Sequence, residues 1–185
     1  MKKIASWILK LMGWKVDKQT PEGIDKAIIV VGPHTSNWDF IVGRLAFFQY
    51  GMPVKILIKK DLFFPPLGWL LKAIGGIPID RKSKNNFTDQ AAEVFNRFDK
   101  VYMVFTPEGT RSYNPNWKKG FYYISLKANV PIYIAYMDYE RKIGGFMEPL
   151  YPSGDVQKDI AYIKEKLSHY KGKYPEKGIR RVEDE

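Results

Sequence analysis

Short apolar runs alternate with segments of helical periodicity along most of this chain, and this alternation constrains the fold more than any other feature. The predicted strands are 27–31, 54–58, 77–79, 101–105, 130–136 and a short strand near 147–150. The predicted helices are 37–50, a segment within 62–74, 86–98, 120–128 and 155–169. Strands separated by helices predict an α/β domain with a mostly parallel or mixed central sheet flanked by helices.

The chain ends differ from this pattern. In residues 1–16 the apolar side chains recur at helical spacing and the lysines lie mostly off their stripe, which predicts an amphipathic N-terminal helix. Such a helix either packs on its own domain or lies in a membrane interface with its lysines toward anionic headgroups. We expect residues 17–171 to form a single domain, because no linker divides them. Residues 172–185 are charged and poor in core residues, which predicts a flexible tail.

The segment 62–74 is unusually apolar for a surface element. Two prolines near its start restrict where a helix can begin, and Gly75-Gly76 ends the helix. A core helix explains this composition, and so does a wall of an acyl-chain tunnel or a membrane-facing surface. The pattern alone leaves these readings open.

Charge and composition limit the chemistry of this chain. It carries 30 basic and 20 acidic residues, so its net charge of +10 predicts a polyanionic partner. Nucleic acid, an anionic membrane surface, and phosphorylated or CoA-thioester substrates all satisfy that balance. The absence of cysteine excludes a thiolate nucleophile, and two distant histidines make a metal site improbable, so we expect none. The remaining catalytic groups are histidine, carboxylates, hydroxyls and the backbone.

His34 follows the apolar run 27–31 directly after Gly32-Pro33, and Asp39 follows five residues later. If the loop folds back, Asp39 can accept the Nδ1 proton of His34 and leave Nε2 as a general base. A structural loop histidine beside an aspartate at a helix start has the same spacing. The pair by itself does not distinguish the two roles.

Two further polar loops follow predicted strands, and in α/β sheets such loops meet at the carboxyl ends of the strands. Their candidate binding residues are Arg81, Glu108, Gly109, Thr110 and Arg111. The two guanidinium groups suit a phosphate, the hydroxyl can donate to it, and the glycine lets backbone approach closely. The carboxylate can orient an arginine or accept from a substrate hydroxyl. These three loops are therefore expected to face one cleft.

The motifs in these loops resemble those of the glycerolipid acyltransferases of the lysophosphatidic acid acyltransferase type. HTSNWD at 34–39 fits the H-x4-D motif, and PEGTRS at 107–112 fits the EGTRS block. IPIDR, which ends at Arg81, is similar to the second family block, and Val130-Pro131-Ile132 to the fourth. The matches occur in family order and cover roughly residues 28 to 137.

The resemblance implies acyl transfer from acyl-CoA or acyl-carrier protein to a hydroxyl of a lysophospholipid or glycerol-phosphate-like acceptor, as in phospholipid biosynthesis. His34 would be the base and Asp39 its partner. The acceptor and its phosphate would be bound by Arg81, Glu108, Gly109, Thr110 and Arg111. No cofactor is expected beyond the acyl donor. The expected location is peripheral, on an anionic membrane surface at the cytoplasmic face of the cell membrane.

Two other classes of function compete with this one. A catalytically silent lipid-binding accessory protein of the same fold is the first, although the intact His34–Asp39 pair counts against it. A basic nucleic-acid-binding module is the second, suggested by the net charge of +10 and the 15% aromatic content. The chain has no RNP-type or zinc-finger pattern, so we expect no nucleic-acid partner.

Overall fold

A seven-stranded sheet runs through the computed structural model, which describes residues 1–17, 23–80 and 87–180. Within these residues the strands are β1 (Lys15–Val16), β2 (Lys26–Gly32), β3 (Val54–Lys59), β4 (Gly76–Ile79), β5 (Val101–Phe105), β6 (Ile132–Asp138) and β7 (Ile143–Phe146). Their order across the sheet is β1-β7-β6-β2-β5-β3-β4. Neighbouring strands are parallel except for β6 and β7, which are antiparallel. The predicted α/β class with a mixed sheet is confirmed.

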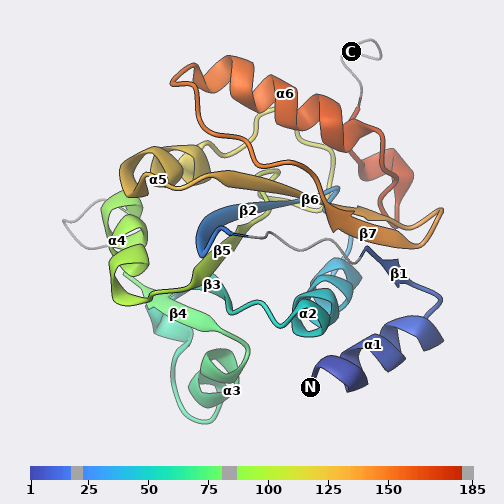
Figure 1. The fold of residues 1–185 in the computed structure, drawn as a ribbon, viewed down its shortest axis with the longest axis horizontal. Helices are drawn as coiled ribbons and strands as arrows, with labels where there is room; N and C mark the ends of the chain where they lie inside the picture. The colour runs from blue at the N-terminus through green and yellow to red at the C-terminus, as the bar shows by residue number, and fades with distance from the viewer. Residues whose placement is uncertain (18–22, 81–86, 181–185) are drawn as a thin grey trace.

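Helices cover both faces of this sheet. The helices in the described residues are α1 (Lys2–Leu11), α2 (Trp38–Tyr50), α3 (Leu67–Ala73), α4 (Phe87–Val94), α5 (Gly120–Ala128) and α6 (Val156–Ser168). Three short 3₁₀ turns accompany them: η1 (Lys60–Leu62), η2 (Phe95–Arg97) and η3 (Pro175–Lys177). Figure 1 shows α4, α5 and α6 on one face, α1 and α2 on the other, and α3 beside the edge strand β4.

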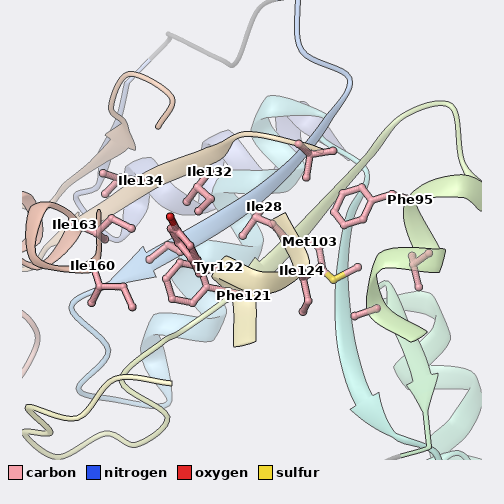
Figure 2. Close-up of a cluster of buried hydrophobic side chains, with 14 of the residues drawn as sticks. Ile28, Phe95, Met103, Phe121, Tyr122, Ile124, Ile132, Ile134, Ile160 and Ile163 are labelled. Atoms are coloured by element: carbon pink, nitrogen blue, oxygen red, sulfur yellow. The ribbon is translucent and has the colours of Figure 1, made fainter. Parts of the chain in front are cut away.

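The central strand β2 is apolar at consecutive positions because helices cover both of its faces. Ile28 and Val30 contribute to the core beneath α4, α5 and α6 (Figure 2). Ile29 and Val31 contribute to a second core, which also contains Leu9 of α1 and residues of α2. Full burial of each such side chain contributes about 1.5–3 kcal/mol. A strand held this way on both faces gives the loop after Gly32 a rigid base.

Helix α2 begins directly after the His34 loop. Asn37 is its N-cap residue, and Asp39 lies in its first turn. The helix ends at Gly51, whose φ of 70° is the left-handed conformation that glycine adopts without strain. The predicted helix 37–50 is thus confirmed, and it delivers Asp39 to the carboxyl end of the sheet.

The strand predicted near residues 147–150 is wrong, because β7 covers Ile143–Phe146 instead. Leu150 forms only an isolated antiparallel bridge to Ile132. Two glycines inside β7, at 144 and 145, make the strand hard to predict from the sequence, because glycine is depleted in strands. Gly145 is required by packing: a Cβ atom there would lie 2.7 Å from the Tyr136 hydroxyl oxygen.

The N-terminal helix is present over Lys2–Leu11. The predicted helical segment extended to residue 16, but Gly13, with φ of 80°, turns the chain and residues 15–16 form β1. Ala5 and Leu9 are buried, and α1 packs against α2. None of the described helices has the length and apolarity that crossing a membrane requires.

Candidate functional site

Two loops meet at the carboxyl ends of the neighbouring parallel strands β2 and β5. The pairing Val30–Phe105 aligns the two strand ends, so the segments after them emerge side by side. The backbone N–H of His34 donates to Oε1 of Glu108 across 2.7 Å. The predicted convergence of the first and third motif loops is therefore observed as a direct hydrogen bond.

His34 and Asp39 form a hydrogen-bonded pair, with 3.0 Å between Nδ1 of the imidazole and Oδ2 of the carboxylate. The loop folds back because the backbone N–H groups of Thr35 and Ser36 also donate to Oδ2, at 2.7 and 2.8 Å. Asp39 is 3% exposed, whereas the His34 side chain keeps 20% of its surface. The geometry anchors Nδ1 and leaves the rest of the imidazole at the edge of a pocket that His34 lines.

Asp39 is held in its charged form. Burial raises its pKa, but hydrogen bonds from His34, Tyr139, Ser36 and Thr35 together outweigh that effect, and the net pKa lies below its ordinary value. A carboxylate fixed beside Nδ1 can stabilise the imidazolium that a general base becomes during a reaction.

Glu108 is a buried support of the His34 loop. It is 2% exposed, and burial raises its pKa to about 7, although the His34 N–H and the His34 charge oppose that shift. Its backbone carbonyl also accepts a hydrogen bond from the Asn114 side chain at 2.7 Å. The position predicted to bind substrate therefore holds the backbone of the predicted base.

The other predicted binding residues are distributed around this centre. Arg111 is exposed and its Nη1 donates to Oδ1 of Asn37, which ties the third motif to the start of α2. Thr110 is exposed and accepts from the Ser112 N–H through its hydroxyl, and Gly109 has φ of 68°, a value that favours glycine. Arg81 lies outside the described residues.

A pocket of about 260 Å³ opens beside His34 and Asp39. Its walls come from α2 and from strands β2, β3, β5 and β6, and most of them are apolar. The apolar side chains that line it are Val31, Phe40, Phe47, Val54, Ile56, Val104 and Met137. Its mostly apolar lining suits a hydrophobic ligand.

A second pocket, of about 540 Å³, lies on the α5 side of the same strand ends. Thr106, Pro107, Gly109 and Lys118 contribute to its lining. Ile56, Val104 and Thr106 line both pockets and form a shared wall. No group of three His, Asp or Glu side chains within residues 1–17, 23–80 and 87–180 could hold a metal ion.

The comparison with known families agrees with this site. The family model named Acyltransferase matches residues 15–138, which is more than half of the chain and includes both motif loops. The chain belongs to the Acyltransferase family. No curated protein sequence gives a significant match to it.

The fold of this acyltransferase-family chain is similar to a solved structure, the 1-acyl-sn-glycerophosphate (LPA) acyltransferase PlsC from Thermotoga maritima. The two share 20% sequence identity with a TM-score of 0.62, and the match covers 91% of this chain and 75% of that one. At this level of identity the likeness concerns the fold.

The sequence analysis did not identify Tyr139, which donates the fourth hydrogen bond to the Asp39 carboxylate. Its hydroxyl donates to Oδ1 of Asp39 at 2.7 Å, and its ring meets Trp14 edge to face at 4.9 Å between centroids. Burial, followed by the contact with Asp39, raises the pKa of Tyr139, so the hydroxyl remains a donor. A signal existed: Tyr139 follows β6, which is parallel to β2, and therefore lies at the same edge of the sheet.

Residues 172–180, the first part of the segment predicted as a tail, pack against the His34 loop. The Tyr174 N–H donates to the Thr35 hydroxyl at 3.2 Å, and a Cβ atom at Gly172 would lie 2.5 Å from a side-chain carbon of Thr35. Lys173 lies over the Trp38 ring at 4.9 Å. Two of these contacts involve a backbone N–H group and a glycine, so the charge and hydropathy of the segment do not predict them.

The raised pKa of Glu108 predicts a pH-dependent stability. The folded pKa of about 7 exceeds the ordinary value of about 4.5. The stability that the protonated form contributes is therefore complete below about pH 4.5 and is lost as pH rises through 7. In Glu108→Gln the amide oxygen can still accept from His34 but does not ionise. Urea unfolding should show Glu108→Gln gaining roughly 2–4 kcal/mol relative to wild type between pH 4.5 and pH 8.

The exposed Glu148 supplies the matched control, since Glu148→Gln removes a carboxyl at the surface. Its unfolding free energy should follow the wild-type pH dependence. A constant offset between Glu108→Gln and wild type at both pH values would contradict the buried-carboxyl account.

Removing the Tyr139 hydroxyl should destabilise the site. Tyr139→Phe deletes one donor to a buried carboxylate, which costs roughly 1.5–3 kcal/mol of unfolding free energy at pH 7. The hydrogen bonds lower the folded pKa of Asp39, so their stabilisation exists above the ordinary carboxyl range and is lost as pH falls through the folded pKa. Urea unfolding at pH 7 and under acidic conditions measures both effects, with Tyr151→Phe, 65% exposed, as the control. Equal losses in the two variants would refute the role of the Tyr139 hydroxyl.

Proposed function

We propose that this protein transfers a fatty acyl group from acyl-CoA or acyl-carrier protein to a hydroxyl of a lysophospholipid or glycerol-phosphate-like acceptor. The observation that carries the proposal is the hydrogen-bonded Asp39–His34 pair at the edge of an apolar pocket. Membership of the Acyltransferase family supports the reaction class. A thioester is already activated, so a positioned base and a bound acceptor suffice for the chemistry.

The proposed reaction proceeds in two proton transfers. Nε2 of His34 removes the proton of the acceptor hydroxyl, and the oxygen attacks the thioester carbonyl to form a tetrahedral intermediate. The intermediate collapses with cleavage of the C–S bond, and the imidazolium returns the proton to the departing thiolate. The charge of Asp39 stabilises the imidazolium between these steps. General-base catalysis of this type contributes about 10²–10⁴-fold, and positioning supplies much of the remainder.

Each substrate part has a proposed location. The acyl chain would lie along the apolar side chains that line most of the pocket of about 260 Å³, since they compensate for removing the chain from water. The acceptor would bind through Arg81, Gly109, Thr110 and Arg111, while Glu108 would act through the His34 loop that it supports. The hydrogen bond from Arg111 to Asn37 supports an acceptor position beside the start of α2.

We further propose that the protein works as a peripheral protein on an anionic membrane surface, at the cytoplasmic face of the cell membrane. Three apolar side chains of α1 are exposed although its other side packs on α2: Ile4 by 64%, Trp7 by 62% and Leu11 by 68%. On α3, Trp69 and Leu70 are 70% and 60% exposed. Figure 1 shows α3 beside the edge strand β4, in the lower part of the view together with α1 and α2. Exposed apolar residues flanked by lysines are typical of a lipid-facing surface.

Replacing the proposed base tests the enzymatic function. His34→Ala should reduce thiol release from acyl-CoA, measured in the presence of lysophosphatidate, by about 10²–10⁴-fold. His169→Ala is the matched control because His169, the other histidine, lies on the surface beside Glu165. It should keep turnover within about twofold, since the hydrogen bond of its side chain is to Glu165 on the surface. Turnover in His34→Ala equal to that in His169→Ala, with both proteins folded, would refute the base assignment.

The lipid-facing surface is tested by vesicle sedimentation. Trp7→Ser with Leu11→Ser removes exposed apolar side chains of α1 and leaves the buried Ala5 and Leu9 intact. Binding to phosphatidylglycerol-containing vesicles should fall by about a hundredfold or more, because each of the two lost side chains would have contributed about 1.5–3 kcal/mol on insertion. Tyr162→Ser, on α6 and 45% exposed, should bind as wild type does. Unchanged sedimentation of the double variant would exclude α1 as the membrane contact.

A further inference from the structure

Arg44 is the only basic residue of α2, a helix that is otherwise largely apolar. It lines the 260 Å³ pocket together with His34 and Asp39. Arg44 lies five residues after Asp39, a rise of about 7.5 Å along the helix axis. A positive charge therefore lines the same pocket as the proposed base.

The guanidinium of Arg44 has no anionic partner in the part of the chain that the structure describes. Its Nε atom is buried and has no hydrogen-bond partner. Its central carbon lies 4.3 Å above the centre of the Phe48 ring, one turn further along α2. Burial lowers the pKa of Arg44, and no neighbouring carboxylate counters that effect. Asp39, the acidic residue of the same lining, already accepts four hydrogen bonds.

An arginine placed in this way carries a cost in the isolated protein. The guanidinium of Arg44 is partly removed from water without a counter-ion among the described residues, which carries a desolvation penalty, and stacking on one aromatic ring recovers only part of it. The penalty is offset when an anion enters the pocket and accepts the unused hydrogen bonds. The planar donor arrangement of arginine matches phosphate oxygens better than it matches a carbonyl or a hydrocarbon chain.

We propose that Arg44 forms a phosphate-binding site inside the pocket, which recognises a phosphate ester of a substrate. This site rests on the proposed acyl transfer and refines it, because it lies on the α2 wall of the pocket. Arg111 lies elsewhere, at the exposed rim, where it donates to Asn37. The expected ligand is the phosphate of the acceptor, whose hydroxyl must reach His34. The phosphates of a CoA donor share this chemistry and are the second source to be distinguished.

Binding without turnover tests the site separately from the reaction. Calorimetric titration of the full chain would use three probes in the absence of any acyl donor: a short-chain lysophosphatidate, the monoacylglycerol of the same chain, and CoA. The variants are Arg44→Gln, which removes the charge, and Arg44→Lys, which keeps the charge but cannot form the bidentate hydrogen bonds of a guanidinium. Arg97→Gln, an exposed position in η2, removes one positive charge outside the pocket and is the matched control.

Arg44→Gln should weaken lysophosphatidate binding by about tenfold or more, with Arg44→Lys intermediate, while monoacylglycerol binding changes by less than about threefold. A loss confined to CoA would support the phosphate site and assign it to the donor. Equal affinity of wild type and Arg44→Gln for both phosphorylated probes would overturn the proposal. So would a parallel loss for monoacylglycerol, which would indicate a packing role.

Stability provides an independent readout. Because Arg44 has no ion-pair partner among the described residues, Arg44→Gln should unfold at the same urea concentration as wild type or a higher one. A structural arginine would show the opposite, a clear loss of stability in both substitutions. If His34→Ala retains full turnover while Arg44→Gln loses phosphate selectivity, the reaction assignment fails and the phosphate site stands.

Discussion

The buried carboxylate of Asp39 is the interaction on which the rest of the site depends. A charged group that is 3% exposed must be fully hydrogen-bonded, and four donors achieve this. Two of them are backbone N–H groups of the preceding loop, so the carboxylate determines the conformation of that loop. The third is the imidazole of His34, which the same contact orients, and the fourth is Tyr139. One buried charge therefore holds the strand end, the loop and the helix start in a single arrangement.

This arrangement requires the rigid sheet beneath it. Strands β2, β5 and β6 are parallel neighbours with buried side chains on both faces, so their carboxyl ends cannot move independently. His34 follows β2, Glu108 follows β5 and Tyr139 follows β6. Each of the three strands contributes a group to the same loop. The packing that stabilises the fold is thus also what sets the distances between the functional groups.

Charge is divided unevenly between the interior of the site and its surface. The acidic groups are buried and engaged: Asp39 with its four donors, and Glu108 with the His34 backbone. The basic groups face the pocket or the rim, where Arg44 has no anionic partner among the described residues and Arg111 is exposed. Such a division favours anionic ligands, in agreement with the net charge of +10. The exposed apolar side chains of α1 and α3 add a hydrophobic surface.

Local sequence patterns determined the elements of this protein, and only the tertiary structure decided how the site is completed. The α/β alternation, the helix after the His34 loop and the two motif loops were all readable, because each depends on residues close together in the chain. The burial of Glu108, the hydrogen bond from Tyr139 to Asp39, and the contact of Tyr174 with Thr35 were not. The last two contacts join residues 100 and 139 positions apart, respectively. Hydropathy and motif spacing do not predict hydrogen bonds between residues so far apart in the chain, because these bonds form only when the folded sheet brings its strand ends together.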